Sequence, residues 1–254
     1  MGCDIHLYAE VKDAEGNWKN YDYRDECVER DDNGKPIYEV YTGEEFVKTS
    51  DLEEVAKYNS EDVSKKINYD KLFKHPLEVG RNYDLFAILA NVRNGYGFAG
   101  CDTGDGFIPI DEPRGLPGDV TDDVKKESDG WGINGHSHSW FTLRELLEYN
   151  WDKQVTEHRG VVSAEEYIAW KEKGGCPESW CGDISGRDVK HLTNSEMDRA
   201  IAEGNTEHCY TSVSWKETYG ESVSHFTENT IPALRKLVQP EDPDAVRIVF
   251  WFDS

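Results

Sequence analysis

The sequence has no long apolar run and few basic residues. No stretch approaches the roughly 18 apolar residues that a membrane-spanning helix needs, so we do not expect a membrane protein. Lysine and arginine number 28 against 51 aspartate and glutamate residues, which gives a formal net charge of −23 at pH 7. Because proteins that bind duplex nucleic acid or acidic membranes usually present a basic surface, neither is an expected partner.

The beginning of the sequence lacks the apolar core of a secretory signal. Charged and polar residues stand there, in the segment MGCDIHLYAE. We therefore expect a cytoplasmic protein, and we expect its six cysteines to be reduced. Cys176 and Cys181 have the spacing of half a zinc site, but no second close pair accompanies them, and we interpret them as unrelated thiols.

Two segments near the ends of the chain have the patterns of β-strands. Residues 5–11 alternate between apolar and polar side chains, which is typical of a half-buried strand. Residues 246–252 form a nearly continuous apolar run, which indicates a buried strand. Together they predict an α+β fold whose mainly antiparallel sheet includes both terminal strands.

Helices and glycine-rich loops are expected between these strands. Apolar spacing predicts helices over 83–92 and 142–149, the second with a capping box at its start. The segments 94–134 and 174–192 are expected to be mostly irregular, and long loops of this kind are more often functional than accidental. Since no linker divides the chain, we predict a single domain over 1–254.

Asp4 and His6 are the first candidates for chemistry. On a strand their side chains point to the same face. A carboxylate beside an imidazole can bind a metal ion or act as an acid–base pair. The alternative is that both face solvent on an ordinary strand.

A second candidate is the segment GHSHSW, which contains His136, His138 and Trp140. If the segment is extended, both imidazoles project the same way. The start of the following helix favours an anion nearby. The alternative is a pair of surface histidines near a helix cap.

The loop GCDTGDG at 100–106 offers carboxylates, among them Asp105, and a flexible backbone that can hold a hard cation. A plain turn is the alternative. Arg81 and Arg114 flank the predicted helix and the long loop, and guanidinium groups are preferred partners of phosphate. In so acidic a chain, an ion pair with Asp or Glu is the alternative for each arginine.

Some of these motifs resemble fragments of the signature of calcineurin-like metallophosphoesterases. They are Asp4-x-His6, Gly104-Asp105 and Gly135-His136-x-His138. The resemblance implies two metal ions that activate water against a phosphoester. The chain departs from that pattern, because the intervening Gly-Asn-His-Asp/Glu stretch is absent and no buried strand precedes the first motif.

A more extensive set of motifs resembles a family of uncharacterised proteins encoded by bacteriophages and prophages. These motifs are MGCDIHLYAE at the start, RNYDLFAILANVRN at 81–94, PRGLP at 113–117, HSHSWFTLRELL at 136–147 and VRIVFWFDS at the end. The resemblance implies a viral accessory protein in the host cytoplasm that modifies host metabolism or blocks host defence.

Our first hypothesis is a phosphoester or nucleotide hydrolase that uses a divalent metal ion. Its proposed metal ligands are Asp4, His6, Asp105, His136 and His138; four of these, Asp4, His6, His136 and His138, would be catalytic, and Arg81, Arg114 and Trp140 would bind the substrate. The alternative is a binding protein without chemistry, which sequesters a nucleotide signal or engages a host protein. A third hypothesis is a nucleophilic enzyme that pairs Cys3 or Cys101 with a histidine.

Overall fold

The computed structural model describes residues 2–58, 67–104, 106–238 and 242–253, and its largest sheet joins the two ends of the chain. The strands of this first sheet are β1 (Asp4–Lys12), β2 (Trp18–Tyr21), β5 (His136–Thr142) and β9 (Val246–Asp253). They lie in the order β2-β1-β9-β5, and all neighbours are antiparallel. The predicted α+β fold, with both terminal strands in a mainly antiparallel sheet, is confirmed.

The first sheet is covered on both faces. This covering buries β9, which is apolar along nearly its whole length. Phe250 and Phe252 face the main core. Helices that contribute to this core are α3 (Tyr83–Ala90), α5 (Leu143–Glu148), α8 (Tyr219–Ser222) and α9 (Ile231–Lys236). On the opposite face, Val249 and Trp251 pack with Val124 of α4 (Asp122–Trp131).

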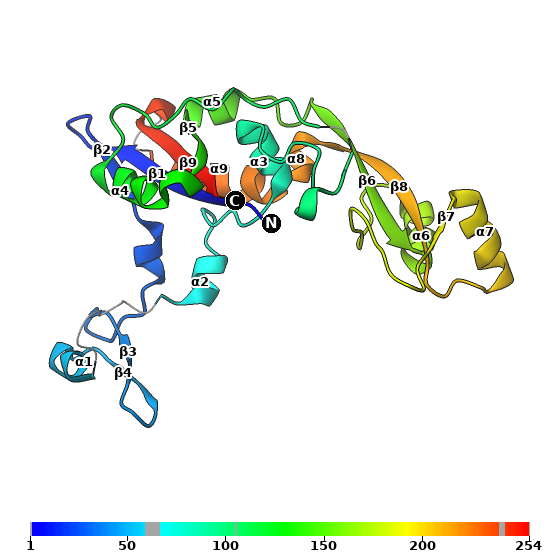
Figure 1. Ribbon diagram of the computed structural model, residues 1–254. Helices are drawn as coiled ribbons and strands as arrows, with labels where there is room; N and C mark the ends of the chain where they lie inside the picture. Colours follow the sequence, from blue (N-terminus) through cyan, green and yellow to red (C-terminus); the bar gives the residue numbers. More distant parts are fainter. Residues whose placement is uncertain (1, 59–66, 105, 239–241, 254) are drawn as a thin grey trace.

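A second sheet extends away from the first (Figure 1). Its strands are β6 (Val155–Ser163), β7 (Lys190–Leu192) and β8 (Cys209–Thr218), with β7 parallel and β6 antiparallel to β8. Two helices, α6 (Ala164–Lys173) and α7 (Asn194–Glu203), accompany this sheet. Met197, Val213 and Trp215 belong to a separate apolar cluster there. The prediction of one domain over 1–254 stays a prediction.

A third part projects from the first sheet as an arm (Figure 1). It contains β3 (Tyr38–Tyr41), β4 (Phe46–Thr49), α1 (Leu52–Tyr58) and α2 (Tyr69–Phe73). The strands β3 and β4 form a two-stranded antiparallel hairpin. Across the described ranges, no helix combines the length and the apolar character that crossing a membrane would require.

The structure refines two sequence-based expectations. Most described residues of 94–134 are irregular, as expected, but the segment also contains the ten-residue helix α4, which was not predicted. This helix buries few side chains, chiefly Val124, so it lacks the broad apolar stripe by which helices are identified. In addition, the helix predicted over 83–92 ends at Ala90, because Asn91 caps it with a left-handed φ of 58°.

A buried ion pair crosses the face of the first sheet that α4 covers. Arg247 on β9 donates from Nε to Glu10 on β1 at 2.7 Å and from Nη1 to Asp119 at 2.7 Å. Glu10 also accepts hydrogen bonds from the backbone and the hydroxyl of Thr121, directly before α4. The ring of Trp18 covers the guanidinium at 4.0 Å. These contacts fasten the segment before α4 to the sheet.

We predict that Arg247→Met destabilises the fold by about 3–5 kcal/mol, because it leaves Glu10 buried without its cation. Urea unfolding followed by tryptophan fluorescence measures the change. The matched control is Arg144→Met, which removes an exposed ion pair with Asp244 and should cost less than about 1 kcal/mol. Equal losses in the two variants would contradict this role of Arg247.

Candidate functional site at the end of the first sheet

His6 lies at the end of the first sheet in a setting of aromatic rings and a carboxylate. The antiparallel register places His6 opposite Trp251 and brings Asp253 beside it. The Nε2 atom of His6 is 3.3 Å from Oδ2 of Asp253. Its ring is 4.2 Å from the ring of Trp131, at the end of α4, and 5.7 Å from that of Trp251. With 20% of its side chain exposed, His6 remains open to a ligand.

Asp4 is engaged by an arginine. Arg81 donates from Nε and Nη2 to the two carboxylate oxygens at 2.7 and 2.6 Å, and this pairing lowers the pKa of Asp4. The backbone N–H of Asp4 donates to Asp253 at 3.0 Å. Because the arginine and aspartate side chains are 43% and 48% exposed, solvent screens this ion pair.

A β-bulge separates the two histidines of β5. The pairing with β9 shifts directly after His136, and Ser137 has a φ of 52°. The ring of His136 then lies over Phe252 at 6.1 Å, and that of His138 over Trp251 at 5.8 Å. Consecutive residues of β9 face opposite sides of the sheet, so the two imidazoles project to different faces. The prediction from an extended segment was that both would project the same way.

The charge state of His138 follows from its surroundings. Burial lowers the pKa of His138, and the neighbouring His136 lowers it further. Neutral imidazole is therefore favoured at this position. Neutral imidazole offers a ligand one donor and one acceptor nitrogen.

Cys3 and Arg93 complete this end of the sheet. The backbone N–H of Cys3 donates to the hydroxyl of Tyr83 at 3.4 Å. Burial raises the pKa of the Cys3 thiol, while Arg93 opposes that shift. A buried, protonated thiol is a poor nucleophile, so this setting does not favour the nucleophilic role proposed for Cys3. Arg93 itself has a left-handed φ of 57°, a strained conformation that is frequent at functional sites.

Two predicted substrate-binding residues are Trp140, on β5, and Arg114, in the loop that packs against this strand. Arg114 contacts Glu145 at 2.7 Å and Asp111 at 2.9 Å, the ion-pair alternative considered from the sequence. Its guanidinium is 5.3 Å from the ring of Trp140. Trp140 in turn lies 5.8 Å from the guanidinium of Arg247, at the buried ion pair. Arg114 is therefore used in ion pairs within the fold, and Trp140 packs against the same apolar cluster as Trp131.

The predicted metal ligands do not assemble into a metal site in the part of the chain that the structure describes. No group of three or more His, Cys, Asp or Glu side chains is placed there to hold a metal ion. Asp4 is paired with Arg81, and His136 and His138 contact different faces of the sheet. Asp105 lies outside the described residues. The proposed ligands that the structure describes therefore form no metal site.

Asp253 and Trp131 belong to the site but were not among the predicted residues. The sequence could have indicated Asp253 as a site residue, because it is the first charged side chain after the apolar run of β9. Trp131 gave no comparable signal, since its position depends on how α4 packs across the sheet.

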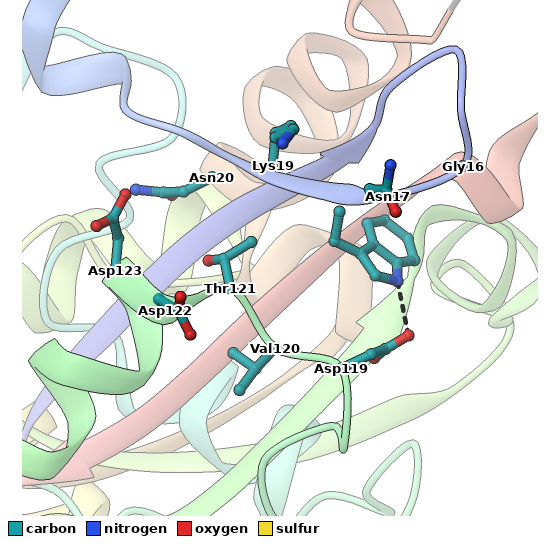
Figure 2. A pocket seen from close by; sticks show the side chains of 10 residues that line it. Gly16, Asn17, Lys19, Asn20, Asp119, Val120, Thr121, Asp122 and Asp123 are labelled. Carbon is teal, nitrogen blue, oxygen red and sulfur yellow. Dashed lines mark hydrogen bonds between the residues drawn. The ribbon is translucent and has the colours of Figure 1, made fainter.

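An open hollow of about 660 Å³ lies on the same face as α4, between the β1–β2 turn and the start of that helix. Figure 2 shows Asp119 and Asp123 among the side chains that line it. The indole N–H of Trp18 donates to Asp119 at 3.0 Å. Asp122 also lines the hollow. Because Asp119 is already bonded to Trp18 and Arg247, we assign this hollow to the structural network before α4.

Comparison with known proteins adds no relative. No protein-family model, curated protein or solved structure matches the chain. The function must therefore be inferred from the geometry of the site.

We predict that His138→Gln changes the pH dependence of stability. The folded protein holds His138 with a lowered pKa, whereas the unfolded chain titrates near 6.5. The unfolded chain therefore gains protons more readily as the pH falls below about 6.5, and stability is lost there. Above that pH the contribution is fully present.

Urea unfolding of the wild type, His138→Gln and the exposed control His225→Gln at pH 8, 7, 6 and 5 measures this effect. We expect the wild type and His225→Gln to lose more stability on acidification than His138→Gln. Parallel pH profiles for all three proteins would show that His138 does not titrate as its burial implies.

Proposed function

We propose that this chain is a binding protein for a small phosphorylated ligand, such as a nucleotide, at the end of its first sheet. The observation that carries the proposal is the joint placement of His6, Trp131 and the Asp4–Arg81 pair. A phosphoester hydrolase that uses a divalent metal is less well supported, because the described residues include no group of three or more His, Cys, Asp or Glu side chains placed to hold a metal ion.

The local charge at this place is balanced, so it does not repel an anion as the rest of the acidic chain would. Arg81 and Arg93 balance Asp4 and Asp253 before any histidine is protonated, although the whole chain carries −23. An exposed ion pair contributes little stability, about 0–1 kcal/mol, so a phosphate can take over the guanidinium of Arg81. Bidentate hydrogen bonding to phosphate is the interaction for which arginine is best suited.

Aromatic surface favours a planar group beside that anion. Trp131 is partly exposed, and its ring contacts that of His6 in a tilted arrangement with the ring centres 4.2 Å apart. Stacking of a nucleobase on an aromatic side chain contributes about 1–3 kcal/mol. A nucleotide would place its phosphate at Arg81 and its base near Trp131.

A second candidate is hydrolysis at the same place without a metal ion. It is favoured by the His6–Asp253 pair, since a carboxylate beside one ring nitrogen can orient an imidazole as a general base. Product formation from nucleotides, abolished by His6→Gln, would select this candidate over binding alone. A viral accessory role in a host cell is a proposal compatible with either candidate.

We predict that nucleotides or pyrophosphate bind the purified protein in the presence of a chelator, and that Arg81→Gln weakens binding at least tenfold because the phosphate loses its guanidinium partner. Trp131→Ala should weaken the binding of nucleotides but leave the binding of pyrophosphate nearly unchanged, because only nucleotides carry a base. Isothermal titration calorimetry measures both effects.

The control is Arg144→Gln, because Arg144 and Asp244 form an ion pair of nearly equal exposure, 46% and 47%. Binding that falls equally in Arg81→Gln and Arg144→Gln would reflect overall charge alone and contradict the site. Absence of binding to any phosphorylated compound would also contradict it.

A further inference from the structure

The hairpin of β3 and β4 presents apolar side chains far from the two larger sheets. Figure 1 shows this hairpin and α1 at the far end of the arm. Phe46 is 70% exposed and Tyr41 is 51% exposed, although both side chains are large and apolar. Single exposed apolar residues are common on protein surfaces, whereas a contiguous group of them indicates an interaction surface.

The register of the hairpin places these two rings side by side. Tyr41 is opposite Phe46, and their ring centres are 5.1 Å apart. The next pair whose side chains point to the same face is Glu39 with Lys48. We call the face that carries these four side chains the hairpin face.

The hairpin face is exposed because the opposite face is used for packing. Val40 of β3 and Val55 of α1 are fully buried, and α1 contacts both strands. Side-chain alternation along the strands then places Tyr41 and Phe46 on the face away from α1. The two rings thus have a folded support, which reduces the entropy that docking on them would cost.

Acidic side chains surround the hairpin face. Residues 29–58 contain nine acidic and four basic residues, which gives a net charge of −5. Lys48 pairs with Glu29 at 2.9 Å, so its charge is compensated. Glu44 and Glu45 are exposed in the turn that joins the two strands. An apolar centre with an acidic rim matches a partner that has an apolar recess and a basic rim.

An open hollow of about 670 Å³ beside the hairpin repeats this combination. Its apolar lining includes Pro36 and the exposed side chain of Leu52. Asp51 and Glu53 contribute two carboxylates to the lining, against the single ammonium group of Lys35. The arm therefore offers apolar surface beside carboxylates in a second place.

Charge also distinguishes between the occupants that such a surface can have. A second copy of this chain would bring two net charges of −23 together, which is unfavourable. Nucleic acids and acidic membranes are repelled for the same reason. A small molecule requires a concave site, whereas the hairpin is a projection at the end of an arm. A protein with a basic contact surface is the occupant that these arguments favour.

We propose that the hairpin face is a docking surface for another protein, whose contact surface is basic and has an apolar recess for Tyr41 and Phe46. Aromatic side chains at the centre of an interface commonly contribute most of the binding energy. Basic groups of the partner pair with Glu44 and Glu45 at the rim and accelerate association. This surface is separate from the ligand site at the end of the first sheet, and neither proposal depends on the other.

Two blocked amphipathic peptides of equal length test the proposal, one made of leucine and lysine and the other of leucine and glutamate. Fluorescence anisotropy of each labelled peptide, titrated with the full chain, measures binding. We expect saturable binding of the Leu–Lys peptide alone. Phe46→Ala and Tyr41→Ala should each weaken this binding about fivefold or more. The double variant Glu44→Gln with Glu45→Gln should weaken it and reduce its dependence on salt.

Phe98→Ala is the matched apolar control, because Phe98 is 62% exposed in the turn Phe98–Gly100. The charge control is Glu172→Gln with Glu203→Gln, which removes the same charge from exposed positions of α6 and α7. Both controls should bind the Leu–Lys peptide as the wild type does. Because all the changed side chains are exposed, every variant should fold, and circular dichroism verifies this.

No saturable binding of the Leu–Lys peptide, or equal losses in Phe46→Ala and Phe98→Ala, would overturn the proposal. Analytical ultracentrifugation of the wild type and Phe46→Ala tests whether a second copy is the occupant. A wild-type dimer that dissociates in Phe46→Ala would assign the hairpin face to self-association and overturn the proposal of a basic partner. A monomer in both proteins would support it.

Discussion

Arg247 is a buried charge near one end of the first sheet, and its partners determine how the neighbouring chain is arranged. Glu10 and Asp119 compensate its charge, and Thr121 bonds to Glu10 directly before α4. A buried charge without such partners would cost several kcal/mol, so the segment before α4 has one favourable position. The helix of ten residues then spans about 15 Å and delivers Trp131 onto His6 at the other end of the sheet.

The bulge in β5 has a comparable effect on the candidate site. An unbroken strand would place His136 and His138 on one face, the arrangement that made a metal site attractive. The left-handed Ser137 instead turns one imidazole toward Phe252 and the other toward Trp251. One extra residue in a strand reverses the face of the sheet to which the preceding side chains point. A local backbone feature therefore decides which ligand chemistry this end of the sheet can support.

The sequence predicted the terminal strands because their patterns are local: alternation in residues 5–11 and an apolar run in 246–252. The sequence also indicated His6 as a candidate site residue, since the alternation of side chains along a strand places it on the same face as Asp4. It did not reveal the partner of His6, because Asp253 reaches it only through a register between strands at opposite ends of the chain. Likewise, the partner of Arg81 depends on a long-range contact with Asp4, which composition cannot specify.

The start of α3 connects the candidate site to α8. Arg81, two residues before α3, reaches Asp4 at the site. Asn82 caps α3 and also donates to the backbone of Ser222 at 3.2 Å, and the hydroxyl of Tyr83 accepts from the backbone N–H of Cys3. One short segment thus positions the arginine proposed to bind an anion and fixes the N-terminus of a helix that packs in the main core. Since residues this close share partners and backbone, the effects of changing Arg81 and Asn82 together are not expected to be additive.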